Sequence, residues 1–529
     1  MKAVLLICAA AFSALAVPPP PGLFDAPSRE HLQWVLSYAD AKDRGVDMPN
    51  PFYGNHNPIA QALSDDQMNV LILLVDFSDN QSQTPSVYFD SMGFARDTFS
   101  LTSYYNDVSF GQIDIVTVNW PSETGWNRVS QDYGYYVNGN YGWGSYPQNS
   151  QGLVEEVCLL ADPLVDFSAY DNDGDGYVDG VNLMYAGQFD GSPNMIWPHA
   201  WSLPSPLTLD GVDVYSFSVQ NEYNNTPEDK SAGVFCHEFG HVMGLPDLYD
   251  YDYDSKGIGN WGLMAGGVYN GGGWSPAELS PYCRHELGTT DYTEVLSPGL
   301  YQVPAYELSN VAYRLWTAGS PNYQYFILEN RRQIRWDEFL PSQGVLIWHV
   351  DELQSGNDNQ WYPGYTSQGH YLVALEQADG DWDLEQNVNG GDSGDPFPGN
   401  SLNPEFSYWS TPDSRKYTGG DTQVYVSAIP ETADTVEVYI STTYAGIGLE
   451  PAPGASIRKT HDSVIVSHPG GPAAIAIHDI TGRVVNTVFR GELNPGDHSF
   501  MIPDDLPAGI YVVSYDSADD LDSVKVFSL

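Results

Sequence analysis

The sequence predicts a multidomain protein in which an α/β domain is followed by a β-rich region and a C-terminal β-sandwich. Its 529 residues are too many for one ordinary domain. Only 17% of them are charged, and the many glycines and prolines indicate a globular chain rich in strands and loops. Helical and strand patterns alternate up to about residue 290, whereas short strand patterns dominate afterwards.

The N-terminus has the pattern of a secretory signal peptide. Lys2 precedes an apolar run, and Ala14-Leu15-Ala16 suits cleavage after residue 16. We expect residues 17–65, which are rich in proline and weakly patterned, to be a pro-segment or N-terminal arm. No later run approaches ~20 uninterrupted apolar residues, so we expect a secreted, extracellular or surface-attached protein without a transmembrane segment.

Residues 66–290 carry the α/β pattern. A strand is expected from Met68, helices over 100–112 and 150–163, and strands over 113–120 and 181–188. Residues 291–445 form the β-rich region, which either completes or flanks this domain. Residues 446–529, after a linker-like "AGIGLEPAPG", alternate as strands of the β-sandwich.

The charge balance excludes some partners. With 20 basic against 69 acidic residues, the net charge of −49 disfavours nucleic acid and anionic membranes. Three cysteines remain after the signal peptide, namely Cys158, Cys236 and Cys283. One disulfide with a free thiol, or three thiols, both fit this number.

A helix with a metal-ligand pattern is predicted in "TPEDKSAGVFCHEFGHVMG". Thr226 can cap its N-terminus, and the apolar residues recur at helical spacing. His237 and His241, four residues apart, then project from one face and can reach a single zinc ion. Glu238 lies beside them and can act as a general acid and base on a zinc-polarised water.

The third zinc ligand is expected from the loop after this helix. Gly244 can end the helix in a left-handed conformation, which returns Asp247 toward the histidines and leaves a fourth position open for water. The alternative is a glutamate on a later helix, for which Glu278 is the best candidate.

An acidic loop, "DNDGDGYVDG", predicts a structural calcium site. Asp171, Asp173, Asp175 and Asp179 occupy ligand positions of a calcium loop, although Asn182 stands where the bidentate glutamate is usual. A plain acidic turn remains the alternative. A second, weaker calcium candidate consists of Asp379, Asp381, Asp383, Asp392 and Asp395.

The stretch "HEFGHVMGLPDLYD", followed by "GIGNWGLMAGG", resembles secreted bacterial metallopeptidases of the immune-inhibitor-A type, which have a metzincin-like architecture. The resemblance covers roughly residues 66–400. It implies zinc ligation by His237 and His241, acid/base catalysis by Glu238, and a methionine turn at Met264 beneath the zinc. Asp247 falls where most metzincins have a third histidine.

The same resemblance leaves the oxyanion partner open. Metzincins with a switching tyrosine place it two residues after the methionine, and here that position is Gly266. Tyr269 is the remaining candidate.

The C-terminal "IHDITGRVV" and "LPAGIYVVSYD" resemble the β-sandwich sorting tails of proteins exported by the type IX secretion route. This resemblance implies secretion machinery as a partner. A plain accessory β-sandwich is the alternative, because the usual basic ending is missing.

These observations predict a zinc-dependent endopeptidase, made as a zymogen, that hydrolyses peptide bonds of protein or peptide substrates. Its strand over 212–220 would suit an edge that binds extended peptide by strand addition, and an ordinary strand of the sheet is the alternative. Residues 17–65 contain no cysteine, so the zymogen cannot be kept inactive by a cysteine that covers the zinc. A carboxylate of the pro-segment, such as Asp25, would block the metal instead. The rival reading is a surface-attached carbohydrate- or matrix-binding protein with a vestigial zinc site.

Overall fold

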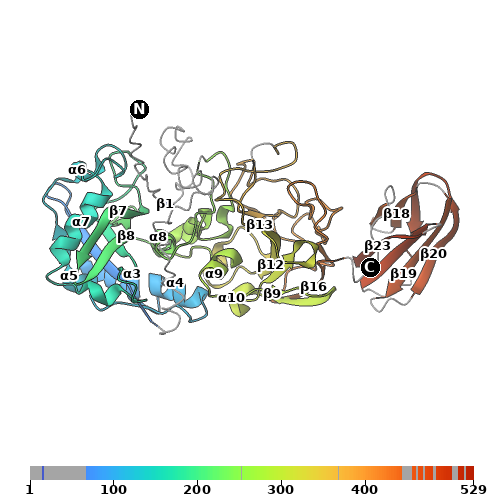
Figure 1. The fold of residues 1–529 in the computed structure, drawn as a ribbon, viewed down its shortest axis with the longest axis horizontal. Coiled ribbons are helices and arrows are strands. Elements are labelled where there is room, and N and C mark those ends of the chain that lie inside the picture. The colour runs from blue at the N-terminus through green and yellow to red at the C-terminus, as the bar shows by residue number, and fades with distance from the viewer. Residues whose placement is uncertain are drawn as a thin grey trace, which may run out of the picture.

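A computed structural model describes residues 67–251, 253–366 and 369–443, together with the two-residue strand β1 (Leu15–Ala16) (Figure 1). In the C-terminal part it describes residues 456–459, 463–468, 471–479, 484–502, 510–517 and 520–528. The rest of the predicted signal peptide and the predicted pro-segment, Asp25 included, lie outside the described residues.

A six-stranded sheet with the order β1-β7-β8-β6-β3-β5 forms the framework of the first half. Its members after β1 are β3 (Leu71–Asp76), β5 (Trp126–Arg128), β6 (Val181–Tyr185), β7 (His199–Leu209) and β8 (Val212–Asn221). The strands β5, β3, β6 and β8 run parallel, whereas β7 is antiparallel to β8. All residues of β3 and β6 are buried, as expected of central parallel strands.

The expected strand over 113–120 is much shorter than predicted. Only β4 (Ile115–Val116) forms, and it pairs with β2 (Met68–Asn69) in a separate two-stranded sheet. The chain beyond it turns, because the Thr117 hydroxyl bonds to the backbone of Asn119 and competes with strand pairing.

Helices cover both faces of the six-stranded sheet. Leu71, Leu73 and Val75 of β3 share a core with α7, whereas Ile72 and Leu74 share a core with α4 and α8. This division follows from the alternation of side chains along a strand. The helices here are α3 (Ser86–Phe94), α4 (Leu101–Val108), α5 (Pro121–Thr124), α6 (Tyr133–Val137), α7 (Ser150–Ala161), η2 (Phe167–Tyr170), α8 (Ala232–Val242), η3 (Gly259–Trp261), η4 (Gly266–Gly273) and α9 (Pro281–Glu286).

The β-rich region beyond residue 290 is confirmed and contains two sheets, ordered β14-β13-β12-β11-β9 and β10-β16-β15. Its elements are β9 (Thr293–Glu294), β10 (Gly299–Pro304), α10 (Tyr306–Ser309), β11 (Tyr313–Trp316), η5 (Thr317–Gly319), β12 (Gln324–Arg331), η6 (Arg335–Phe339), β13 (Gly344–Asp351), β14 (Val373–Leu375), β15 (Tyr425–Ser427) and β16 (Thr435–Ser441). Ile327 of β12 and Trp348 of β13 belong to the same core as Phe239 of α8. The five-stranded sheet therefore packs against the helices of the first half.

The C-terminal strands form a three-stranded sheet, β17-β18-β21, and a four-stranded sheet, β20-β19-β22-β23. Their bounds are β17 (Ser456–Lys459), β18 (Ser463–His468), β19 (Gly471–Asp479), β20 (Val484–Leu493), β21 (Gly496–Met501), β22 (Ile510–Ser517) and β23 (Asp520–Ser528). Val466 of β18 and Ile475 of β19 lie in one hydrophobic core. The two sheets therefore pack on each other as a small sandwich.

Cys158, Cys236 and Cys283 are buried free thiols, so the structure has three thiols rather than one disulfide and one thiol. Burial raises the pKa of each of them. No helix in the described part of the chain is long and apolar enough to cross a membrane.

Candidate metal centre

Helix α8 carries the His-Glu-x-x-His motif, and all of its residues are buried. Its N-cap is Ser231, so the predicted start at Thr226 is wrong. The Asp229 carboxylate accepts hydrogen bonds from three backbone amides between residues 224 and 226, and Glu228 is left-handed with a φ of 66°. A carboxylate that binds backbone amides in this way stabilises a turn instead of a helix.

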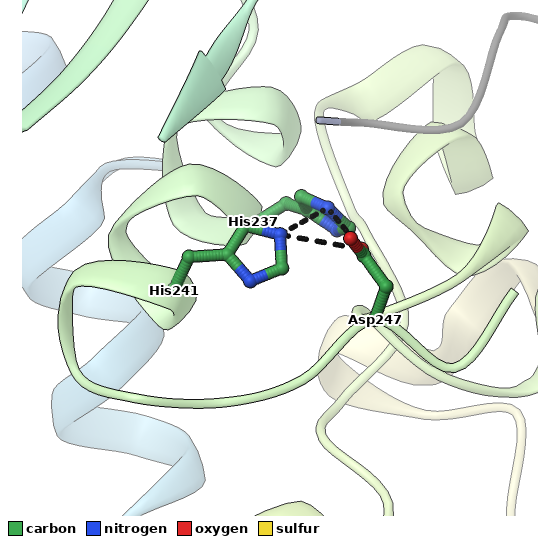
Figure 2. Close-up of side chains that lie close together, drawn as sticks. All are labelled: His237, His241 and Asp247. Atoms are coloured by element: carbon green, nitrogen blue, oxygen red, sulfur yellow. Dashed lines mark hydrogen bonds and ion pairs between the residues drawn. The ribbon is translucent and has the colours of Figure 1, made fainter. Parts of the chain in front are cut away.

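Three side chains converge on one point beside α8 (Figure 2). The Nε2 atoms of His237 and His241 are 3.1 Å apart. Asp247 Oδ1 lies 3.1 Å from His237 Nε2 and 3.2 Å from His241 Nε2. All three side chains are completely buried, so no solvent screens them from one another.

The hydrogen bond made by Nδ1 of each imidazole determines whether its Nε2 carries a proton. His237 Nδ1 lies 2.9 Å from the Leu263 carbonyl, and His241 Nδ1 lies 2.8 Å from the Leu245 carbonyl. Because a carbonyl only accepts, each Nδ1 carries the proton and each Nε2 presents a lone pair. Two lone pairs and a carboxylate oxygen at such distances form a donor set that can hold a cation.

The three spacings fit a zinc ion. With bonds of about 2.0 to 2.1 Å, a tetrahedral zinc places its ligand atoms about 3.3 Å apart. Burial by itself raises the pKa of Asp247, but the charge and hydrogen bonds that His241 and His237 supply when they are protonated lower it to about 2, so Asp247 offers a charged oxygen at neutral pH. The residues present therefore fit the metal that the sequence predicts.

Gly244 returns the chain toward the histidines, as its position predicts. Its φ is 96°, and the Leu245 amide donates to the Gly240 carbonyl at 2.9 Å, which closes the end of α8. The Leu248 amide then donates to the Met264 carbonyl at 2.8 Å. These bonds hold the loop that carries Asp247.

Two further residues support this loop, and the sequence analysis missed both. The Tyr251 hydroxyl donates to Asp247 Oδ2 at 2.8 Å. The Asn357 amide group, buried in the loop after β13, donates to the Leu248 carbonyl at 2.9 Å and to the Val373 carbonyl at 2.8 Å. Tyr251 follows Asp247 by four residues, but nothing in the sequence connects Asn357 with this loop.

Met264 lies against α8, where the resemblance places a methionine turn. It is 1% exposed, and a Cβ added to Gly240 would come within 2.8 Å of its sulfur atom. Gly240 stands between His237 and His241 on the helix, so the methionine packs next to the ligand-bearing turns.

A side chain at the position of a switching tyrosine would displace Asn260. A Cβ added to Gly266 would lie 2.5 Å from Asn260 Oδ1. Tyr269, three residues on, is half-buried, and burial together with the charge of Glu238 raises its pKa. Tyr269 is therefore close enough to Glu238 for their charges to interact.

Glu238 is completely buried, next to His237 on α8. Its negative charge also acts on Lys230, whose pKa falls to about 7 because burial outweighs the charges of Glu238 and Asp229. Lys230 Nζ donates to Asn221 Oδ1 at 2.7 Å. A buried lysine beside the motif was not singled out by the sequence.

Glu278, the alternative third ligand, has a different partner. Its carboxylate forms a buried ion pair with Arg284, and its amide donates to Asp337 Oδ1 at 2.8 Å. Among the described residues, the carboxylate beside the two imidazoles is that of Asp247.

The predicted calcium loop is only partly assembled. Carboxylate oxygens of Asp171, Asp173 and Asp175 lie within 4.8 Å of one another. Asp179 stands outside this group, and its Oδ2 accepts hydrogen bonds from the backbone and side-chain amides of Asn172, both at 2.7 Å. Burial raises the Asp179 pKa to about 7, so calcium ligation by Asp179 stays a prediction without structural support.

In the second acidic cluster, three of the five carboxylates come together. Asp379, Asp392 and Asp395 offer oxygens within 4.8 Å of one another, whereas Asp381 and Asp383 do not join them. Asp395 also accepts a hydrogen bond of 2.9 Å from the indole of Trp261. This contact gives Asp395 a structural role whether or not calcium binds.

Comparison with known proteins points to the same chemistry. Residues 76–289 match the family model described as immune inhibitor A peptidase M6, catalytic domain. This segment resembles a metallopeptidase catalytic domain. It contains strands β5 to β8 of the six-stranded sheet, helix α8 and the loop that bears Asp247.

Two relatives give the extent of the similarity. Immune inhibitor A of Bacillus thuringiensis subsp. alesti is 28% identical over 267 residues, which is 40% of this chain and 38% of that protein. The pre-pro-metalloprotease PrtV of Vibrio cholerae serotype O1 (strain M66-2) is 27% identical over 273 residues, 41% of this chain and 29% of that protein. The chain thus spans about a third of the length of these relatives, and the similarity supports a metal-dependent protease.

Proposed function

We propose that this chain is a zinc-dependent endopeptidase that cleaves peptide bonds of proteins. The observation that supports it most strongly is the convergence of His237 Nε2, His241 Nε2 and Asp247 Oδ1, three acceptor atoms within 3.2 Å of one another. The similarity to metalloproteases supports the same reaction class.

A zinc ion held there would polarise the scissile carbonyl and acidify a water molecule. Glu238 is the only remaining acid in the motif, and it is buried beside the ligands. In our proposal its carboxylate takes a proton from the attacking water and delivers that proton to the leaving amine. Tyr269, within reach of the Glu238 charge, is the candidate donor to the developing oxyanion.

The substrate would pair with β7. The sequence left open whether the strand over 212–220 is a peptide-binding edge or an ordinary strand. β8 is an ordinary interior strand, because it is hydrogen-bonded to β6 on one side and to β7 on the other. β7 is the strand next to the sheet edge, and β1 pairs with it there, Leu15 opposite Ala200 and Ala16 opposite His199. An extended peptide can take the same place by strand addition.

Export of a pro-enzyme belongs to the proposal. The signal peptide at residues 1–16, the pro-segment at 17–65 and the sorting role of residues 446–529 remain predictions from the sequence. One relative is named a pre-pro-metalloprotease, which fits a signal and a pro-segment in that protein. Calcium at Asp171, Asp173 and Asp175 would be structural, because it offsets the repulsion of three close carboxylates.

Casein hydrolysis tests the proposed function. The wild-type protein should release peptides, and a zinc chelator should stop the release until zinc is restored. Glu238→Gln should bind zinc but lose at least about 1000-fold in rate, because no general base remains. Equal peptide release by wild type and variant would reject the peptidase, and the reading as a surface-attached binding protein would then be preferred.

A further inference from the structure

A cavity of about 480 Å³ lies in the β-rich region, outside the segment that matches the peptidase family. Its wall is formed by β13 and the loop that follows it, the chain after β14, and the loop over residues 411–419. Small-ligand sites have volumes of roughly 300 to 1000 Å³. The proposed peptidase chemistry uses none of the residues in this wall.

Two tryptophans of the wall keep part of their surface accessible. Trp361 and Trp382 are both half-buried. The backbone of Trp382 is left-handed, with a φ of 53°, which is unfavourable for a bulky side chain. Such strain persists where the surrounding structure imposes it, and it collects at ligand-binding sites.

Charges of both signs border the cavity. Asp413 lies in the wall together with Arg415 and Lys416, and Arg415 Nη2 is 2.6 Å from Asp413 Oδ2. An anion would meet the Asp413 carboxylate, and a cation would meet the two basic side chains. The wall therefore suits an uncharged ligand that both donates and accepts hydrogen bonds.

A buried polar pair underlies the wall. His349 Nδ1 lies 2.9 Å from Glu376 Oε1, and the His349 ring stacks on Tyr417 with centroids 4.2 Å apart. Burial lowers the pKa of His349 to about 3 and raises that of Glu376 to about 8, so both groups are neutral near pH 7. His349 Nε2 forms no hydrogen bond with any described residue. This pair adds uncharged hydrogen-bonding groups to the cavity.

We propose that the cavity binds a neutral sugar ring, as a non-catalytic site separate from the metal centre. The C–H face of a pyranose stacks on indole surfaces such as those of Trp361 and Trp382, and its hydroxyls donate and accept at once. Glu376 and Asp413 accept from hydroxyls, whereas Arg415 and Lys416 donate to them. A lipid chain does not fit, because it would desolvate these polar and charged groups without compensation.

Titration of the full-length protein with cellotriose, maltotriose and tri-N-acetylchitotriose tests this proposal, by tryptophan fluorescence and calorimetry. At least one trisaccharide should bind saturably. Trp361→Ala and Trp382→Ala should each weaken that binding at least tenfold, and Trp382→Phe should restore part of it. Trp409→Ala is the matched control, because Trp409 is 40% exposed and lies outside the wall.

The proposal fails if none of the three sugars binds at millimolar concentration. It also fails if Trp361→Ala and Trp382→Ala bind the sugars as well as Trp409→Ala does, or if a proline-rich peptide binds in place of the sugars. Casein hydrolysis should be unchanged in Trp361→Ala, so loss of this site and loss of the peptidase are distinguishable.

Discussion

The Tyr251 hydroxyl donates a 2.8 Å hydrogen bond to Asp247 Oδ2, while Asp247 Oδ1 faces the two imidazoles. Tyr251 thus orients the carboxylate through the oxygen that does not face the imidazoles. Loss of an outer hydrogen bond of this kind weakens metal binding about 10- to 100-fold. We expect Tyr251→Phe to lower zinc affinity by that factor, measured by competition with a chromogenic chelator.

Tyr104→Phe is the control for this variant. It also removes a buried hydroxyl, one that donates to the Ala277 carbonyl at 2.8 Å, but it touches no proposed ligand. Zinc affinity should stay at the wild-type value in Tyr104→Phe. Equal affinities in both variants would show that Tyr251 does not position Asp247.

Asp247→Ala and Glu278→Gln should separate metal binding from stability. Asp247→Ala should lose bound zinc, as measured by metal analysis of the purified protein. Glu278→Gln should keep its zinc but lower the free energy of unfolding by about 3 kcal/mol, because it leaves the buried Arg284 guanidinium without its counter-charge. Zinc loss in Glu278→Gln with normal zinc in Asp247→Ala would reverse the assignment of the third ligand.

Glu376 should make stability depend on pH. Burial, reinforced by Asp413, raises its pKa from 4.5 to about 8, so the folded state holds a proton that the unfolded state releases above pH 4.5. The stability that this proton contributes to the folded state is complete below pH 4.5 and is lost as pH rises through 8. Glu376→Gln should therefore reduce the loss of stability between pH 5 and 8 by about 2 to 4 kcal/mol, measured by urea unfolding. An unchanged pH profile would contradict the assigned pKa.

The peptidase unit should extend well beyond residue 289, where the family match ends. A chain ending at residue 290 loses Ile327 and Trp348 from the shared core, and it loses Asn357 from the Asp247 loop. We expect that chain to aggregate or to unfold without a cooperative transition. A chain ending at residue 443 should unfold cooperatively and bind zinc, which circular dichroism and metal analysis would show.

Local patterns were sufficient for the ligand-bearing helix. His237 and His241 face one point because residues four apart share a helix face, and Gly244 turns the chain because glycine adopts a positive φ readily. The start of the helix was predicted wrongly, since Asp229 binds the preceding amides instead of leaving them to a helix.

Local sequence patterns did not predict the tertiary contacts. Asn357 acts on Leu248 across 109 positions of sequence, so no local spacing reveals the contact. The choice between β7 and β8 as the edge depends on strand order, which alternation of side chains does not encode. The same holds for the cavity, because Trp361 and Arg415 meet only after the β-rich region folds.

Two prolines limit main-chain hydrogen bonding between β7 and a neighbouring chain. Pro204 and Pro206 are exposed, and the pairing of β7 with β8 shifts register between Ser202 and Leu207. Proline has no amide hydrogen, so neither Pro204 nor Pro206 can donate to a neighbouring chain, and donors for main-chain pairing are confined to the part of β7 before Pro204. The footprint of main-chain pairing is then short, and the same prolines keep copies of the molecule from joining edge to edge. In the proposed peptidase, selectivity among substrates would accordingly come from side chains near the cleaved bond rather than from a long stretch of backbone.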